Sequence, residues 1–101
     1  MLLQVTGESN PNVLKLVGEL DLSTGKILED VVQAQVQKSS PLVLDLSELT
    51  FMDSTGLRLI LKTVNDRNGG PPLVLLHPTE PVRRLLALAL PPSVPGLEIQ
   101  D

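Results

Sequence analysis

An acid, two hydroxyl groups and a glycine stand in a row at residues 53–56 (DSTG), between two apolar segments of this 101-residue chain. A hydroxyl in such a place is a candidate phosphate acceptor, and a phosphate carries about −1.5 to −2 charges at neutral pH. The preceding segment, residues 42–46, has the leucine- and valine-rich composition of a buried strand, and leucines recurring from Leu57 predict an amphipathic helix. Ser54 would therefore stand where a helix begins, and the first N–H groups of a helix favour an anion.

The same residue types are also common helix caps, because their side-chain oxygens accept hydrogen bonds from the unpaired N–H groups of the first turn. The sequence leaves two interpretations of Ser54 open: it is only a cap, or it presents its hydroxyl to another protein. In the second interpretation Gly56 would let that protein approach the backbone closely. A phosphate on Ser54 would then change the charge of the surface and leave the fold intact.

The rest of the chain predicts an α/β domain, because strand patterns alternate with helical patterns. Five segments have strand composition, the first two as a hairpin: residues 2–6, 13–20, 42–46, 73–76 and 97–100. Three segments repeat apolar residues with helical spacing: Ile27, Leu28, Val31, Val32 and Val36; Leu57, Ile60, Leu61 and Val64; Val82, Leu85, Leu86 and Ala89. We expect one domain over residues 1–101, with a mixed sheet of four to five strands and about three helices packed mainly on one face. The tail, residues 91–101, is expected to be irregular apart from its short strand.

The composition argues against several classes of function. A net charge of −4 argues against binding nucleic acid or an anionic membrane, which requires clustered Lys and Arg. The chain has no cysteine and a single histidine, His77, so we expect no metal and no cofactor. Phe51 is the only aromatic residue, and we expect it in the core. There is no basic leader and no apolar run near the roughly 20 residues that span a bilayer, so we expect a cytoplasmic protein.

Three blocks of the sequence resemble the anti-anti-sigma factors of the STAS-domain family. They are residues 18–24 (GELDLST), 42–47 (LVLDLS) and 51–57 (FMDSTGL), in the family's order and roughly its spacing. The resemblance covers about residues 2–90 and implies partner switching in transcription regulation, in a stress response or sporulation. The unmodified protein would bind an anti-sigma factor that is also a serine kinase, which frees the sigma factor. The kinase would use ATP to phosphorylate the antagonist, and a PP2C-type phosphatase would reset it.

Carried over by position, the resemblance makes Ser54 the phosphate acceptor, Thr55 a second candidate acceptor, and Asp53 an acid that orients the hydroxyl. The remaining expected partner-binding residues lie on the same surface: Asp21, Ser23, Thr24, Gly56 and Arg58. Asp21 would contact the kinase or, with equal support, cap the helix that follows.

Two features depart from the family's pattern. Arg58 replaces a residue that is usually small, and it could pair with the added phosphate or with an acidic partner. Family members usually have a further helix after the last strand, and this sequence ends at Asp101 without one. Either departure would alter which kinase is recognised.

Other functions fit the sequence less well. Asp45 resembles the phosphorylated aspartate of receiver domains, but the acidic pair that holds magnesium after the first strand is missing, and we expect Asp45 to bind the turn at residues 47–50. A hydrolase based on Ser54 and His77 lacks the Gly-x-Ser-x-Gly pattern, so we expect no enzyme activity. A STAS scaffold that does not switch, or a module that senses a small ligand, stays open. We expect a monomer or weak dimer.

Overall fold

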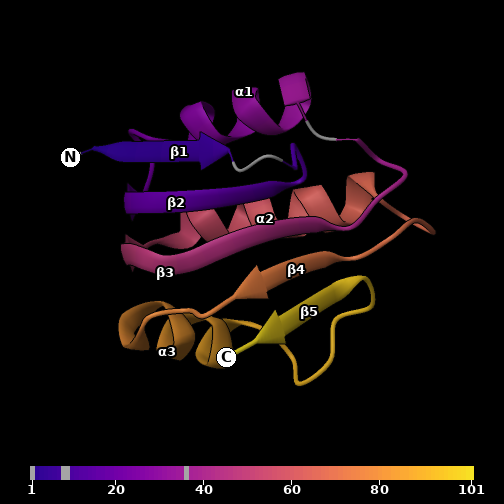
Figure 1. The fold of residues 1–101 in the computed structure, drawn as a ribbon. Coiled ribbons are helices and arrows are strands. Elements are labelled where there is room, and N and C mark those ends of the chain that lie inside the picture. Colours follow the sequence, from indigo (N-terminus) through magenta and orange to yellow (C-terminus); the bar gives the residue numbers. More distant parts are fainter. Residues whose placement is uncertain (1, 8–9, 36) are drawn as a thin grey trace.

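The computed structural model describes residues 2–7, 10–35 and 37–101, and Figure 1 shows their arrangement. In chain order the elements are β1 (Leu3–Gly7), β2 (Val13–Leu20), α1 (Gly25–Gln35), β3 (Leu42–Met52), α2 (Ser54–Asp66), β4 (Leu73–Leu76), α3 (Glu80–Ala89) and β5 (Leu97–Gln100). The strands form one sheet in the order β1-β2-β3-β4-β5. β1 and β2 pair antiparallel, as the predicted hairpin requires, and the other neighbours pair parallel. The expected mixed sheet with helical crossovers is confirmed, including the short last strand.

The core lies between the helices and one face of the sheet. Its strand residues are mostly leucines at alternate positions: Leu14, Leu16, Leu42, Leu44, Leu46, Leu73 and Leu75. Helices α1 and α2 run along one face (Figure 1) and contribute Leu28 and Ile60 to this cluster. Helix α3 adds Val82 and Leu86 to the same cluster. Every one of these side chains is less than a tenth exposed, so burial of apolar surface on one face stabilises the domain.

Strand β3 is longer than the sequence predicts. The polar residues after position 46 suggested a turn, but the strand continues to Met52. Its pairing with β2 shifts register twice, between Lys15 and Val17 and between Gly18 and Glu19, and each shift adds one residue to β3. The Oδ1 atom of Asp45 accepts a hydrogen bond from the Ser47 N–H (2.9 Å) at the first shift. Asp45 is therefore structural, as expected, but it stabilises a bulge in a strand and not a turn.

The second register shift also explains why the expected burial of Phe51 is wrong. Leu49 and Met52 are buried, whereas Thr50 and Phe51 between them both face outward, and Phe51 is 42% exposed. Strict alternation would have sent one of the pair inward. Three described helix positions also differ from the prediction, because Ile27, Leu61 and Ala89 are exposed. Val36 lies outside the described residues.

The loops at the amino-terminal end of β3 are held by two buried polar side chains. Asn12 donates its side-chain amide to the carbonyl oxygens of Gln37 (2.7 Å) and Ser40 (3.1 Å). Arg67, at the end of α2, donates its guanidinium to the carbonyl oxygens of Ser40 and Pro71. These bonds fix the connections into β3 and out of α2 at this end of the sheet.

Gly18 leaves no room for a side chain. Its φ is +118°, and a Cβ atom would lie 2.2 Å from the carbonyl oxygen of Leu2. We expect Gly18→Ala to lower the free energy of unfolding by about 2 kcal/mol or more, because β1 would have to move. Gly69→Ala is the matched control: Gly69 has φ +76° and a Cβ atom there would have no heavy atom within 4 Å, so only backbone strain of about 1 kcal/mol is expected. Urea unfolding measures both; equal losses would contradict the close contact at Gly18.

Candidate functional site

Ser54 is the first residue of α2 and its side chain is exposed. The N-cap of this helix is Asp53, whose Oδ1 atom accepts a hydrogen bond from the Thr55 N–H (2.8 Å). Within residues 2–7, 10–35 and 37–101, no hydrogen bond uses the Ser54 hydroxyl. The interpretation of Ser54 as the cap is therefore wrong, and its hydroxyl is available to other molecules. Asp53 binds the helix backbone and not the Ser54 hydroxyl, so its expected orienting role would need a partner-induced change.

The pairing of β2 with β3 places a second loop beside Ser54. Leu20 lies opposite Met52 in the sheet, and the Asp53 N–H donates to the Leu20 carbonyl oxygen (3.2 Å) just beyond it. At the start of α1, a Cβ on Gly25 would lie 3.1 Å from the Thr55 methyl carbon. The loop at residues 21–24 and the first turn of α2 are thus neighbours at the carboxyl end of the sheet, where α/β folds commonly bind ligands.

The loop at residues 21–24 is fixed by its own polar side chains. The Asp21 carboxylate accepts hydrogen bonds from the Ser23 hydroxyl (2.7 Å), the Ser23 N–H (2.9 Å) and the Thr24 N–H (3.2 Å). Asp21 is 8% exposed and Thr24 is 2% exposed. The helix-capping interpretation of Asp21 is favoured by these bonds, and Thr24 does not reach the surface where a partner could touch it. Ser23 is exposed, although its hydroxyl already donates to Asp21.

The Ser23 hydroxyl also sets the acidity of Asp21. Its hydrogen bond is the largest cause that holds the pKa of Asp21 below the usual value, with smaller contributions from the N–H groups of Ser23 and Thr24; burial opposes the shift. The ionised carboxylate is thus the form that the folded loop stabilises.

Gly56 serves packing and not partner access. It is buried, and a Cβ atom there would lie 2.4 Å from Met52 Cγ and 3.1 Å from Leu20 Cδ2. The absence of a side chain lets α2 pack closely against the ends of β2 and β3. The expectation that a partner approaches the backbone at Gly56 is therefore wrong, and the glycine instead sets the position of Ser54.

Arg58 and Thr55 occupy different faces of the first turns of α2. Arg58 is exposed and lies four residues after Ser54, so the two side chains share one helix face. A phosphate on Ser54 could therefore accept hydrogen bonds from the guanidinium as well as from N–H groups of the first turn. Thr55 is half-buried against Gly25, which makes it the less accessible of the two hydroxyl-bearing residues.

The sequence analysis did not identify Leu22 as a surface residue. Its side chain is 80% exposed, although Asp21 before it is buried. Its type and position gave no signal, because a leucine beside a strand is usually a core residue. Only the folded loop shows that this side chain points to solvent.

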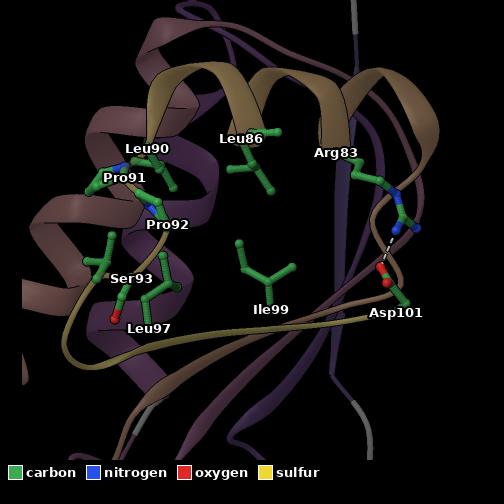
Figure 2. Close-up of a pocket in the computed structure, with 11 residues that line it drawn as sticks. Arg83, Leu86, Leu90, Pro91, Pro92, Ser93, Leu97, Ile99 and Asp101 are labelled. Carbon is green, nitrogen blue, oxygen red and sulfur yellow. Dashed lines mark hydrogen bonds and ion pairs between the residues drawn. The ribbon is translucent and has the colours of Figure 1, made fainter.

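His77 and the cavity between α3 and β5 are not part of the surface around Ser54. His77 is an exposed turn residue with φ +53°, and its N–H donates to the Gln100 carbonyl oxygen (2.7 Å). A cavity of about 580 Å³ lies between α3 and β5, with Leu86, Leu90 and Ile99 facing it and the Arg83–Asp101 ion pair at one end (Figure 2). It contains none of the predicted site residues.

Metal sites and membrane-spanning helices are both missing from the described part of the chain. Residues 2–7, 10–35 and 37–101 contain no group of three or more His, Asp or Glu side chains arranged to hold a metal ion. The same residues include no helix with both the length and the apolar character needed to cross a membrane.

Comparisons with known proteins agree with this fold. The family model described as Mlab, STAS domain, matches residues 3–89. A curated relative from Paenibacillus polymyxa, named Anti-sigma F factor antagonist, is 35% identical over 96 aligned residues that span 88% of this chain and 80% of the relative. The solved structure of the anti-sigma factor antagonist SpoIIAA in its unphosphorylated form is 22% identical, with a TM-score of 0.59 over 99% of this chain and 88% of that chain. At that identity the structural match supports the fold alone.

The hydrogen bonds to Asp21 predict a specific dependence of stability on pH. Because the pKa of Asp21 is lower in the folded state, its ionised form stabilises the protein above about pH 4, and this contribution is lost as the pH falls through the lowered pKa. Asp21→Asn should therefore be less stable than the parent at pH 7, with a difference that narrows below about pH 4. Asp30→Asn removes an exposed carboxylate that pairs with Lys26 (3.1 Å) and should change little. Urea unfolding between about pH 3 and pH 7, a range that includes the usual carboxylate pKa, measures the difference in stability between Asp21→Asn and the parent. A difference that does not change with pH would contradict the stabilising role of the ionised Asp21.

Proposed function

Because this chain belongs to the STAS domain family and is 35% identical to an anti-sigma F factor antagonist, we propose that it acts as an anti-sigma factor antagonist. In this proposal the unmodified protein binds an anti-sigma factor that is also a serine kinase, and the bound sigma factor is released. The kinase then phosphorylates Ser54 with its own ATP, and the complex separates. A phosphatase of the PP2C type removes the phosphate. The chain itself supplies a surface and a phosphate acceptor, without a catalytic step or a cofactor.

The observation that carries this proposal is the exposed hydroxyl of Ser54 at the first position of α2, which forms no hydrogen bond with the described residues. A kinase must bring the hydroxyl within reach of the γ-phosphate of ATP, so a buried or hydrogen-bonded serine would be a poor acceptor. Asp53 supplies the N-cap, which means that modification of Ser54 removes no bond from the helix. The phosphate would also lie close to the positive end of the helix dipole. The fold can therefore be the same before and after phosphorylation.

Release of the partner follows from the added charge. A phosphate adds about −1.5 to −2 charges to a surface that already has Asp53, and like charges brought together at an interface cost several kcal/mol. A loss of about 1.4 kcal/mol weakens binding tenfold, so one phosphate is enough to separate a tight complex. Arg58 would offset part of this charge by pairing with the phosphate from one turn along α2.

The second candidate is a STAS module that responds to a small ligand or holds its partner permanently. The cavity between α3 and β5 favours it, because a volume of about 580 Å³, lined by apolar side chains and by the Arg83–Asp101 ion pair, falls in the range of small-molecule sites. Under this alternative the exposed serine would have no role, so the two candidates separate on the behaviour of Ser54.

Phosphorylation can be tested with an anti-sigma factor kinase encoded in the same genome. Incubation with the kinase and ATP should add one phosphate to the intact mass of the chain. Ser54→Ala should abolish the addition while leaving the fold unchanged, since the hydroxyl makes no bond to the described residues. Thr55→Ala is the matched control and should still be phosphorylated. Phosphate on Ser54→Ala, or none on the parent protein, would contradict Ser54 as the acceptor.

Charge as the cause of release predicts that Ser54→Asp binds the kinase more weakly than Ser54→Ala. Aspartate carries about one charge against the −1.5 to −2 of phosphate, so we expect an intermediate effect of about tenfold. Titration calorimetry with the kinase measures it, and the difference should shrink as salt is added because exposed charges are screened. Equal affinity of the two variants at low salt would argue against charge repulsion.

A further inference from the structure

We propose that Leu22 is the apolar anchor of the partner-binding surface, and that it inserts into a hydrophobic pocket of the anti-sigma factor kinase beside the site of phosphoryl transfer. This inference rests on the proposed function and names the contact that supplies its binding energy. The inference starts from the position of Leu22, which lies in the loop at residues 21–24, next to the first turn of α2, and is 80% exposed.

The loop that presents Leu22 is held on both sides of it. On one side the backbone of Asp21 is engaged. Its carbonyl oxygen accepts a hydrogen bond from the Gly25 N–H (2.9 Å), and its N–H donates to the Thr24 hydroxyl (2.9 Å). On the other side the Thr24 hydroxyl donates to the Glu19 carbonyl oxygen (2.8 Å). Buried side chains thus hold a short surface turn in place. A contact residue on a fixed turn loses less conformational entropy on binding than one on a flexible loop.

The sheet places Leu22 and Ser54 at the same end of neighbouring strands. Leu22 follows Leu20 by two residues and Ser54 follows Met52 by two residues, and Leu20 and Met52 are partners in the β2–β3 ladder. Adjacent strands lie about 4.8 Å apart. A protein that reaches the Ser54 hydroxyl therefore meets the loop of Leu22 as well.

Among the expected partner-binding residues, Ser54 and Arg58 are exposed, but most of the others offer a partner little. Asp21 and Thr24 use their polar atoms internally, Gly56 is buried, and the Ser23 hydroxyl donates to Asp21. Polar contacts near Ser54 fix orientation, but burying an apolar side chain in a partner's pocket is what usually dominates a binding energy. A phosphate on Ser54 would add a strongly hydrated group beside this contact and so oppose its desolvation.

Single exposed leucines are common on proteins, and this chain provides a matched control in Leu88, which is 81% exposed on α3. The experiment measures the affinity of the unphosphorylated chain for the kinase with a non-hydrolysable ATP analogue, for the parent, Leu22→Ala, Leu22→Met and Leu88→Ala. We expect Leu22→Ala to bind at least about tenfold more weakly, Leu22→Met to bind nearly as the parent does, and Leu88→Ala to match the parent. The heat-capacity change of binding should also become less negative in Leu22→Ala, because less apolar surface is buried.

The outcomes separate the two proposals. Since Leu22 is exposed, urea unfolding should show equal stability for all four proteins, so weaker binding would not reflect unfolding. Affinity of Leu22→Ala within about twofold of the parent, or an equal loss in Leu88→Ala, would overturn the anchor and leave the proposed function standing. Absence of any binding and phosphorylation of the parent would overturn the proposed function, and the anchor with it.

Discussion

The parallel pairing of β2 with β3 is the constraint on which the site depends. It puts Leu20 beside Met52, so that the loops leaving the two strands meet, and the Asp53 N–H extends the ladder by one further bond to Leu20. Gly56 then lets α2 approach Met52 more closely than any larger residue would allow. Two bulges add two residues to β3 relative to β2, and without them Leu20 would lie opposite Thr50, so that Asp53 would lie further beyond the end of β2. The exposed serine is thus a consequence of strand register.

The structure separates the residues that build the site from those that face solvent. Asp21, Thr24 and Gly56 are buried and fix two loops, whereas Leu22, Ser54 and Arg58 project outward from those loops. This division allows a charge to be added to the surface without any change in the bonds beneath it. The proposed switch would need no second conformation, because the phosphate itself would change the affinity for the partner.

The alternation of strands and helices was readable from the sequence because each element has a hydrophobic period of its own and is bounded by Gly, Pro or polar turns. The errors fall where tertiary pairing overrides local pattern. The polar residues from Ser47 to Thr50 look like a turn, yet β2 pairs with them and keeps them extended. Phe51 looks like a core residue, yet a register shift turns it outward. Apolar character predicts that a residue can be buried, but the register decides whether it is.

The sequence by itself determined the α/β class, the resemblance to the STAS family, and the placement of Ser54 where a strand gives way to a helix, because these depend on residue types in local order. Only the tertiary structure decided which of the neighbouring polar residues are caps and which are free. A side chain of Ser, Thr or Asp is equally suited to bond a nearby backbone group or to face a partner, and the conformation of the folded loop decides between the two. Thr24 turns inward to the Glu19 carbonyl and Asp53 caps α2, which leaves the Ser54 hydroxyl without a bond to the described residues. Leu22 became visible as a surface residue for the same reason, since its exposure depends on the hydrogen bonds of the residues on either side of it.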